Sequence, residues 1–112
     1  MKYSEITVKV GLNDQKIPTD IKWKASDSEM NQFSDCKSFA LSIWDPISAN
    51  TLNLSLWTDS MQTDEMHSFY FQSLIQQVDN YTKATGNPFA KEMVKSFVQE
   101  LAKKTSDWEN SK

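Results

Sequence analysis

The sequence predicts an α+β domain, a two-layer sandwich of order ββαβαα in which a three-stranded sheet is covered on one face by three helices. Two observations predict it. Three segments alternate apolar and polar residues with the period of a half-buried strand, and three others carry apolar stripes with the period of a helix. A hydrophobic content of 38% and an aromatic content of 12% supply enough apolar bulk for one core.

The first two strands are predicted to form a β-hairpin. Residues 6–12 place Ile6, Val8 and Val10 on alternate positions, and β-branched residues favour strands. Residues 13–16 are a polar turn, and a second alternation runs from residue 17 to residue 25. Pro18 cannot donate a ladder hydrogen bond, so we expect it at the start of the second strand or on a sheet edge.

A loop is predicted over residues 26–32, followed by the first helix. Ser34 is its expected N-cap, and Pro46 is expected to end it at Asp45. The predicted apolar stripe, at i, i+3, i+4 and i+7, consists of Cys36, Phe39, Ala40 and Ile43.

The third strand is predicted over Thr51–Thr58. Leu52, Leu54 and Leu56 share one face, and Asn53, Ser55 and Trp57 share the other. Its partner in the sheet, the first or the second strand, is left open. Because a three-stranded sheet has unpaired edges, edge pairing into a homodimer is a hypothesis.

Two further helices complete the predicted fold. Thr63 is expected to cap the longer one, with Gly86 just beyond its end in a left-handed conformation. Asn87-Pro88 opens the last helix, whose expected buried residues are Phe89, Met93, Phe97, Val98 and Leu101. We expect a single domain over residues 1–104 and a fraying polar tail over residues 105–112.

Composition excludes several classes of function. The net charge is −3, and all twelve basic residues are lysine, so the bidentate contacts that arginine makes with guanine and phosphate are missing. We therefore expect no nucleic-acid binding.

Short apolar runs predict no membrane insertion, the opening residues lack the apolar stretch of a secretion signal, and a lone cysteine fits a reducing compartment. The expected location is the cytoplasm.

Few residues indicate chemistry. Cys36 and His67 could form a thiol–imidazole pair, but Cys36 is better explained as an apolar filler and His67 as a surface residue. Carboxylates near a helix start could hold a metal with His67, although the helix dipole favours acidic residues there anyway; they are Asp59, Asp64 and Glu65. We expect no catalytic residue, no cofactor and no metal, and hence no enzyme.

Aromatic residues indicate a contact surface for a protein partner. Trp57 lies on the strand face opposite the leucines, where an exposed tryptophan can be a binding hot spot. The alternative is that residues 44–46, or the loop that follows Trp57, cover Trp57 locally and that Asp45 and Asn50 make turn hydrogen bonds. The predicted contact residues are Trp57, Trp44, Asp45, Asn50 and Thr58.

The chain resembles the family of the gliding motility protein GldC over about residues 2–104. The residues that carry the resemblance are Lys37–Asp45, Asn50-Thr51-Leu52, Leu56-Trp57-Thr58, Met61, Asp64-Glu65-Met66 and Ala84-Thr85-Gly86. The resemblance implies a small cytoplasmic accessory protein of gliding bacteria of the Bacteroidetes type, without enzymatic activity or cofactor, that assists the gliding machinery. Our leading hypothesis is a protein-interaction module. The alternative is a small-ligand or metal-binding domain with a pocket between sheet and helices.

Overall fold

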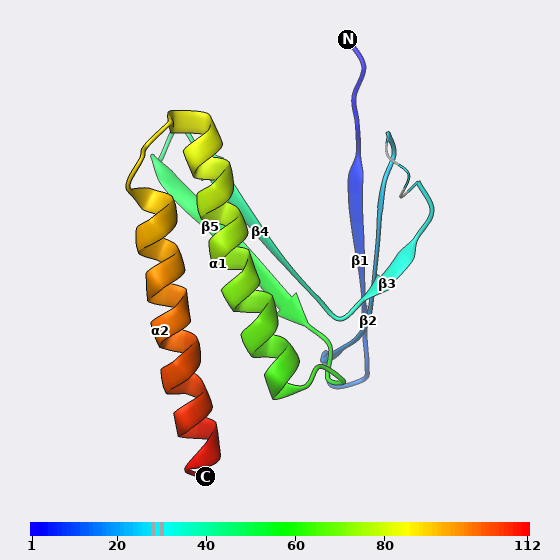
Figure 1. Ribbon diagram of the computed structural model, residues 1–112. Coiled ribbons are helices and arrows are strands. Elements are labelled where there is room, and N and C mark those ends of the chain that lie inside the picture. Colours follow the sequence, from blue (N-terminus) through cyan, green and yellow to red (C-terminus); the bar gives the residue numbers. More distant parts are fainter. Residues whose placement is uncertain (28, 30) are drawn as a thin grey trace. The chain divides into compact units, whose positions relative to one another are not determined.

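The structure, a computed structural model, describes residues 1–27, 29 and 31–112. Its elements follow the order β1-β2-β3-β4-β5-α1-α2 (Figure 1). The chain divides into two compact units: a strand unit, Met1–Met61, and a helical unit, Gln62–Lys112. The α+β class is confirmed. The predicted single sheet and three helices are wrong, because the described residues form five strands in two antiparallel sheets and two helices.

The predicted β-hairpin is confirmed. β1 (Ile6–Leu12) pairs antiparallel with β2 (Pro18–Ala25), with Val8 opposite Trp23 and Val10 opposite Ile21. Asn13 shapes the turn, since its side-chain oxygen accepts the backbone N–H groups of residues 15 and 17 at 2.8 and 3.1 Å. Pro18 is the first residue of β2, a position where the missing N–H costs no interior ladder bond.

The predicted first helix is wrong, because that segment is extended. β3 (Ser34–Cys36) pairs with β2, placing Cys36 opposite Ile21, and β4 (Ser38–Asp45) begins one residue later. The loop predicted before it contains residues 28 and 30, which lie outside the described residues, while Ser26 and Asp27 form a turn.

β4 pairs antiparallel with β5 (Asn50–Trp57), the strand predicted over Thr51–Thr58. Phe39, Leu41 and Ile43 lie opposite leucines at positions 56, 54 and 52. A helix would have placed Leu41 away from Phe39 and Ile43, whereas a strand puts all three on one face. Cross-strand pairing of these large apolar side chains explains why the segment is a strand.

α1 (Thr63–Thr85) confirms the predicted long helix, shifted at its start by one residue. Its N-cap is Gln62 rather than Thr63: the Gln62 N–H donates to Glu65 Oε1 at 2.9 Å in a capping box. Gly86 ends the helix as predicted, with φ 72° and its N–H donating to the Thr82 carbonyl at 2.8 Å.

α2 (Ala90–Asn110) begins two residues after Pro88 and continues through most of the segment that was expected to fray. It runs antiparallel to α1, and the pairs Asp79–Lys91 at 3.9 Å and His67–Glu109 at 3.2 Å join the helices near both ends. Val94, Val98 and Leu101 are buried or half-buried. The predicted burial of Phe89, Met93 and Phe97 is wrong, because these side chains lie on a different side of α2 and are exposed.

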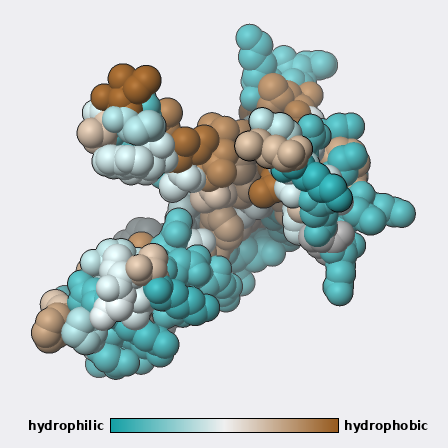
Figure 2. Space-filling view, turned by 90° about the horizontal axis from the view of Figure 1, so that it is seen from above, coloured by the Kyte–Doolittle hydropathy of each residue, from teal (hydrophilic) through white to brown (hydrophobic). Residues whose placement is uncertain are grey.

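Buried apolar residues are few among those described. Ile21 on the central strand β2 is 1% exposed and Val98 on α2 is 5% exposed. Other apolar side chains remain open, and hydrophobic surface is visible as brown areas in Figure 2. The predicted covering of a sheet face by helices stays a prediction.

Candidate interaction surface

Trp44 and Trp57 lie on the same face of the β4–β5 hairpin. Trp44 is opposite Thr51 near the turn, and Trp57 is opposite Ser38 at the open end. Six residue steps along β4 separate these two positions, about 20 Å at the usual strand rise. The face between them carries small or polar side chains, and Ser42 Oγ donates to Asn53 Oδ1 across the strands at 2.6 Å. We call this face, residues 38, 40, 42, 44, 51, 53, 55 and 57, the tryptophan face.

Both tryptophans are open to solvent. Trp44 is 62% exposed and Trp57 is 48% exposed. Local covering of Trp57 by residues 44–46 does not occur, because those residues are at the opposite end of the hairpin. Instead, Trp57 borders a hollow of about 210 Å³ that Ile17, Pro18 and Asp59 also line. Trp57 is therefore partly supported by neighbouring residues and still presents a free ring surface.

Asp45 and Asn50 face each other where the hairpin closes. The Asp45 carboxylate accepts the Ser48 hydroxyl at 2.9 Å and the Ile47 N–H at 3.0 Å. The first of these bonds, followed by the second, lowers the pKa of Asp45 below its usual range. Both bonds lie within the turn, which supports the alternative interpretation of Asp45 as a turn residue.

Thr58 is 4% exposed, so the structure does not place it on the tryptophan face. Its N–H donates to the Lys37 carbonyl at 2.8 Å, and its hydroxyl lies 3.1 Å from Ser60 Oγ. The next N–H, from Asp59, donates to the Pro18 carbonyl at 3.0 Å. These bonds tie the end of β5 to the residue between β3 and β4 and to the start of β2.

The opposite face of the same hairpin is apolar. Its six side chains, which we call the leucine face, are half-buried or exposed; they are Phe39, Leu41, Ile43, Leu52, Leu54 and Leu56. Sequence reasoning found the three leucines and missed the β4 half of the face. The alternation of Phe39, Leu41 and Ile43 was the signal that could have revealed it.

The surroundings of Cys36 do not activate its thiol, and His67 is engaged with residues of the helical unit. Cys36 is on a strand rather than in a first helical turn, and its partial burial raises the pKa of the thiol, with a smaller opposing effect from the Ser38 N–H. His67 stacks on Phe71, with ring centroids 5.9 Å apart. Its Nε2 contacts Glu109 Oε1 at 3.2 Å.

The acidic residues near the start of α1 accept backbone N–H groups at the N-terminus of that helix. Asp64 accepts the Glu65 N–H at 2.9 Å, and the Glu65 side chain accepts the N-cap N–H.

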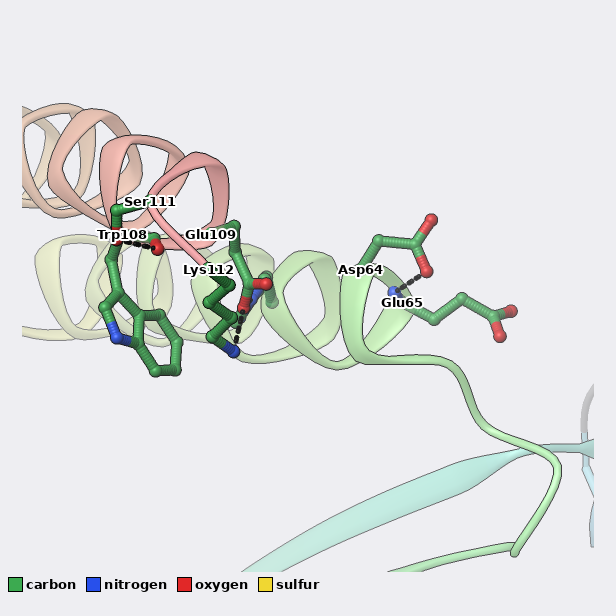
Figure 3. A network of polar contacts seen from close by, with 7 residues as sticks. Asp64, Glu65, Trp108, Glu109, Ser111 and Lys112 are labelled. Carbon is green, nitrogen blue, oxygen red and sulfur yellow. Dashed lines mark hydrogen bonds and ion pairs between the residues drawn. The ribbon is translucent and has the colours of Figure 1, made fainter.

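At the far end of α2, Glu109 accepts a hydrogen bond from Lys112 at 3.3 Å (Figure 3). The His67 bond, with a smaller part from Lys112, lowers the pKa of Glu109. Within the described residues, no group of three or more His, Cys, Asp or Glu side chains could hold a metal ion.

Comparison with known proteins gives one match. No helix among the described residues is both long enough and apolar enough to span a membrane. No curated protein and no solved structure matches the chain. One family model, described as gliding motility-associated protein GldC-like, matches residues 18–107 and so covers most of both units. The chain therefore belongs to the GldC-like family of gliding motility-associated proteins.

Proposed function

We propose that this protein is a non-enzymatic cytoplasmic accessory protein of bacterial gliding motility that acts by binding a protein partner of the gliding machinery. Family membership supports the process. The observation that supports binding is the tryptophan face, where Trp44 and Trp57 are about half exposed or more on one side of a single hairpin. Tryptophan is the residue type most enriched among interface hot spots.

The dimensions of the tryptophan face suit a protein surface. Two rings about 20 Å apart fit within the roughly 800 Å² that one partner contributes to a standard interface. The residues between them are small or polar, so a partner can approach the strands closely while the two rings fill pockets on it. Asp45 and Asn50 close the hairpin next to Trp44 and hold that end of the face in place.

The chemistry of the site residues supports a role without catalysis. The Cys36 thiol has a raised pKa, which favours the unreactive protonated form at neutral pH. His67 is engaged with Glu109 and Phe71 inside the helical unit. Asp64 and Glu65 are engaged in capping α1.

Capture experiments test the proposal. Purified protein carrying a cleavable photo-crosslinker is added to an extract of a gliding bacterium that has a protein of this family. The captured proteins are then identified. We expect a gliding-machinery protein with the wild type and its loss with Trp44→Ala or Trp57→Ala. Tyr3→Ala is the matched control, because Tyr3 is an exposed aromatic outside the hairpin. Equal capture by all variants would contradict a role for this face.

A motility assay connects capture to function. A strain lacking its own copy of the gene is complemented with each variant, and colony spreading is measured. Wild type and Tyr3→Ala should restore spreading, whereas Trp44→Ala and Trp57→Ala should not, at equal protein levels. Restoration by both tryptophan variants would contradict the proposal.

One feature favours a second candidate, a small-ligand-binding domain. A hollow of about 390 Å³ lies in the strand unit, within the size range of small-molecule sites, and its lining is largely apolar: Ile6, Val8, Trp23, Cys36 and Ser38–Leu41. It lies between strands, and not at the predicted place between sheet and helices. Native mass spectrometry separates the candidates: a stoichiometric added mass supports a ligand, and a bare protein mass favours the interaction module.

A further inference from the structure

The helical unit carries an apolar stripe on each helix that the α1–α2 contact does not use. On α1 the stripe is Tyr70, Leu74 and Tyr81, spaced by four and seven residues. On α2 it is Phe89, Met93, Phe97 and Trp108, with spacings of four, four and eleven. Such spacings keep side chains in line along a helix. All seven side chains are between 36% and 71% exposed.

Both stripes lie on the same side of the helical hairpin. On α1 the stripe is offset by roughly 60° from the line of the half-buried residues His67, Phe71 and Val78. On α2 the offset from Val94, Val98 and Leu101 is roughly 90° and has the same sense along the chain. Because the helices are antiparallel, offsets of the same sense place the two stripes on the same side of the helical hairpin. We call these seven residues the aromatic helix face.

The area of this face matches what one copy contributes to a stable dimer. Large side chains bury about 150–250 Å² each, so seven that are about half exposed offer roughly 700 Å². A standard interface takes about 800 Å² from each partner. The composition also fits, because Tyr, Trp, Phe and Met are enriched at interfaces and this face contains them almost exclusively.

The face has a projection at one end and borders a hollow. Phe89 and Met93 are its most exposed side chains, and a hollow of about 200 Å³ lies farther along α2 between Phe97, Glu100, Leu101 and Lys104. Under two-fold symmetry a projection on each copy meets a hollow on the other, which is the self-complementarity that an isologous interface requires. Two antiparallel helix pairs joined in this way form a four-helix bundle.

We propose that a second copy of this chain covers the aromatic helix face, forming a homodimer through a four-helix bundle. This surface is distinct from the tryptophan face and from the sheet edges.

Sedimentation velocity of the full-length protein over a wide concentration range tests this proposal. The wild type should form a reversible dimer. Phe97→Asp and Met93→Asp should each raise the dimer dissociation constant roughly 30-fold or more, the effect of losing an interface hot spot. Tyr3→Asp is the matched control, an exposed aromatic on the strand unit outside the tryptophan face, and should leave the dissociation constant unchanged.

The result that would overturn the proposal is a monomer at every concentration, or a dimer that neither helical substitution weakens. Circular dichroism of each variant checks that α1 and α2 are intact. Met93→Asp keeps the test decisive if Phe97→Asp fails to fold, because Met93 is the more exposed of the two side chains.

Discussion

Truncating Ile21 to alanine should destabilise the strand unit more than any comparable change on its surface. Ile21 lies on the central strand β2 between Val10 on β1 and Cys36 on β3, and it is 1% exposed. Replacing a buried isoleucine with alanine costs about 2–5 kcal/mol. The neighbouring Val10 and Cys36 are only half-buried and can close part of the cavity, so we expect about 2–3 kcal/mol.

Urea unfolding followed by tryptophan fluorescence measures this cost, at one protein concentration so that dimerisation does not differ between samples. With a slope of about 1–3 kcal/mol per molar urea, the midpoint should fall by about 0.7–3 M. The control is Ile6→Ala, on the same face of the sheet but largely exposed, which should cost about 0.5 kcal/mol or less. Equal midpoint shifts for the two variants would refute the assignment of Ile21 as the core of this unit.

Three other predictions concern single groups. Gly86→Ala should lower the unfolding free energy by about 1–2 kcal/mol in thermal or urea melts, because φ is 72° there; an unchanged stability would contradict the left-handed cap. Asp45 has a lowered pKa, so the stability of wild type relative to Asp45→Asn should be largest above about pH 5 and should be lost as the pH falls below about 4 and through the lowered pKa. A pH-independent difference would show that the carboxylate does not stabilise the turn. The Cys36 thiol, whose pKa is raised by burial, should react slowly with a thiol reagent at neutral pH and at the rate of a free cysteine in denaturant; fast labelling of the native protein would contradict its burial.

Local patterns predicted the elements whose structure depends on local chemistry. Three features are determined by their own residues: the alternating strand at residues 6–12, the turn shaped by Asn13 and the helix end at Gly86. The segment around Phe39 does not. Its apolar residues satisfy a helical stripe and an alternation at once, and the pairing of Leu41 with Leu54 decides between them. Pairing between distant residues cannot be read from one segment alone.

The candidate site was predicted in part for the same reason. The leucine and tryptophan faces of β5 follow from its alternation, so the exposure of Trp57 could be inferred. Trp44 was expected beside the stripe of a helix, and only the strand register shows that it shares a face with Trp57. Thr58 is buried where its backbone hydrogen-bonds to another segment, and no pattern in the sequence around it predicts this burial.

Among the described residues, the pairs β1–β2, β4–β5 and α1–α2 are each built from elements adjacent in sequence. Such an arrangement has a low contact order, so little loop-closure entropy is lost before the first native contacts form. The β1–β2 and β4–β5 hairpins can each form soon after their own residues leave the ribosome, before the helices have been synthesised. We therefore expect refolding without a slow phase from long-range strand pairing.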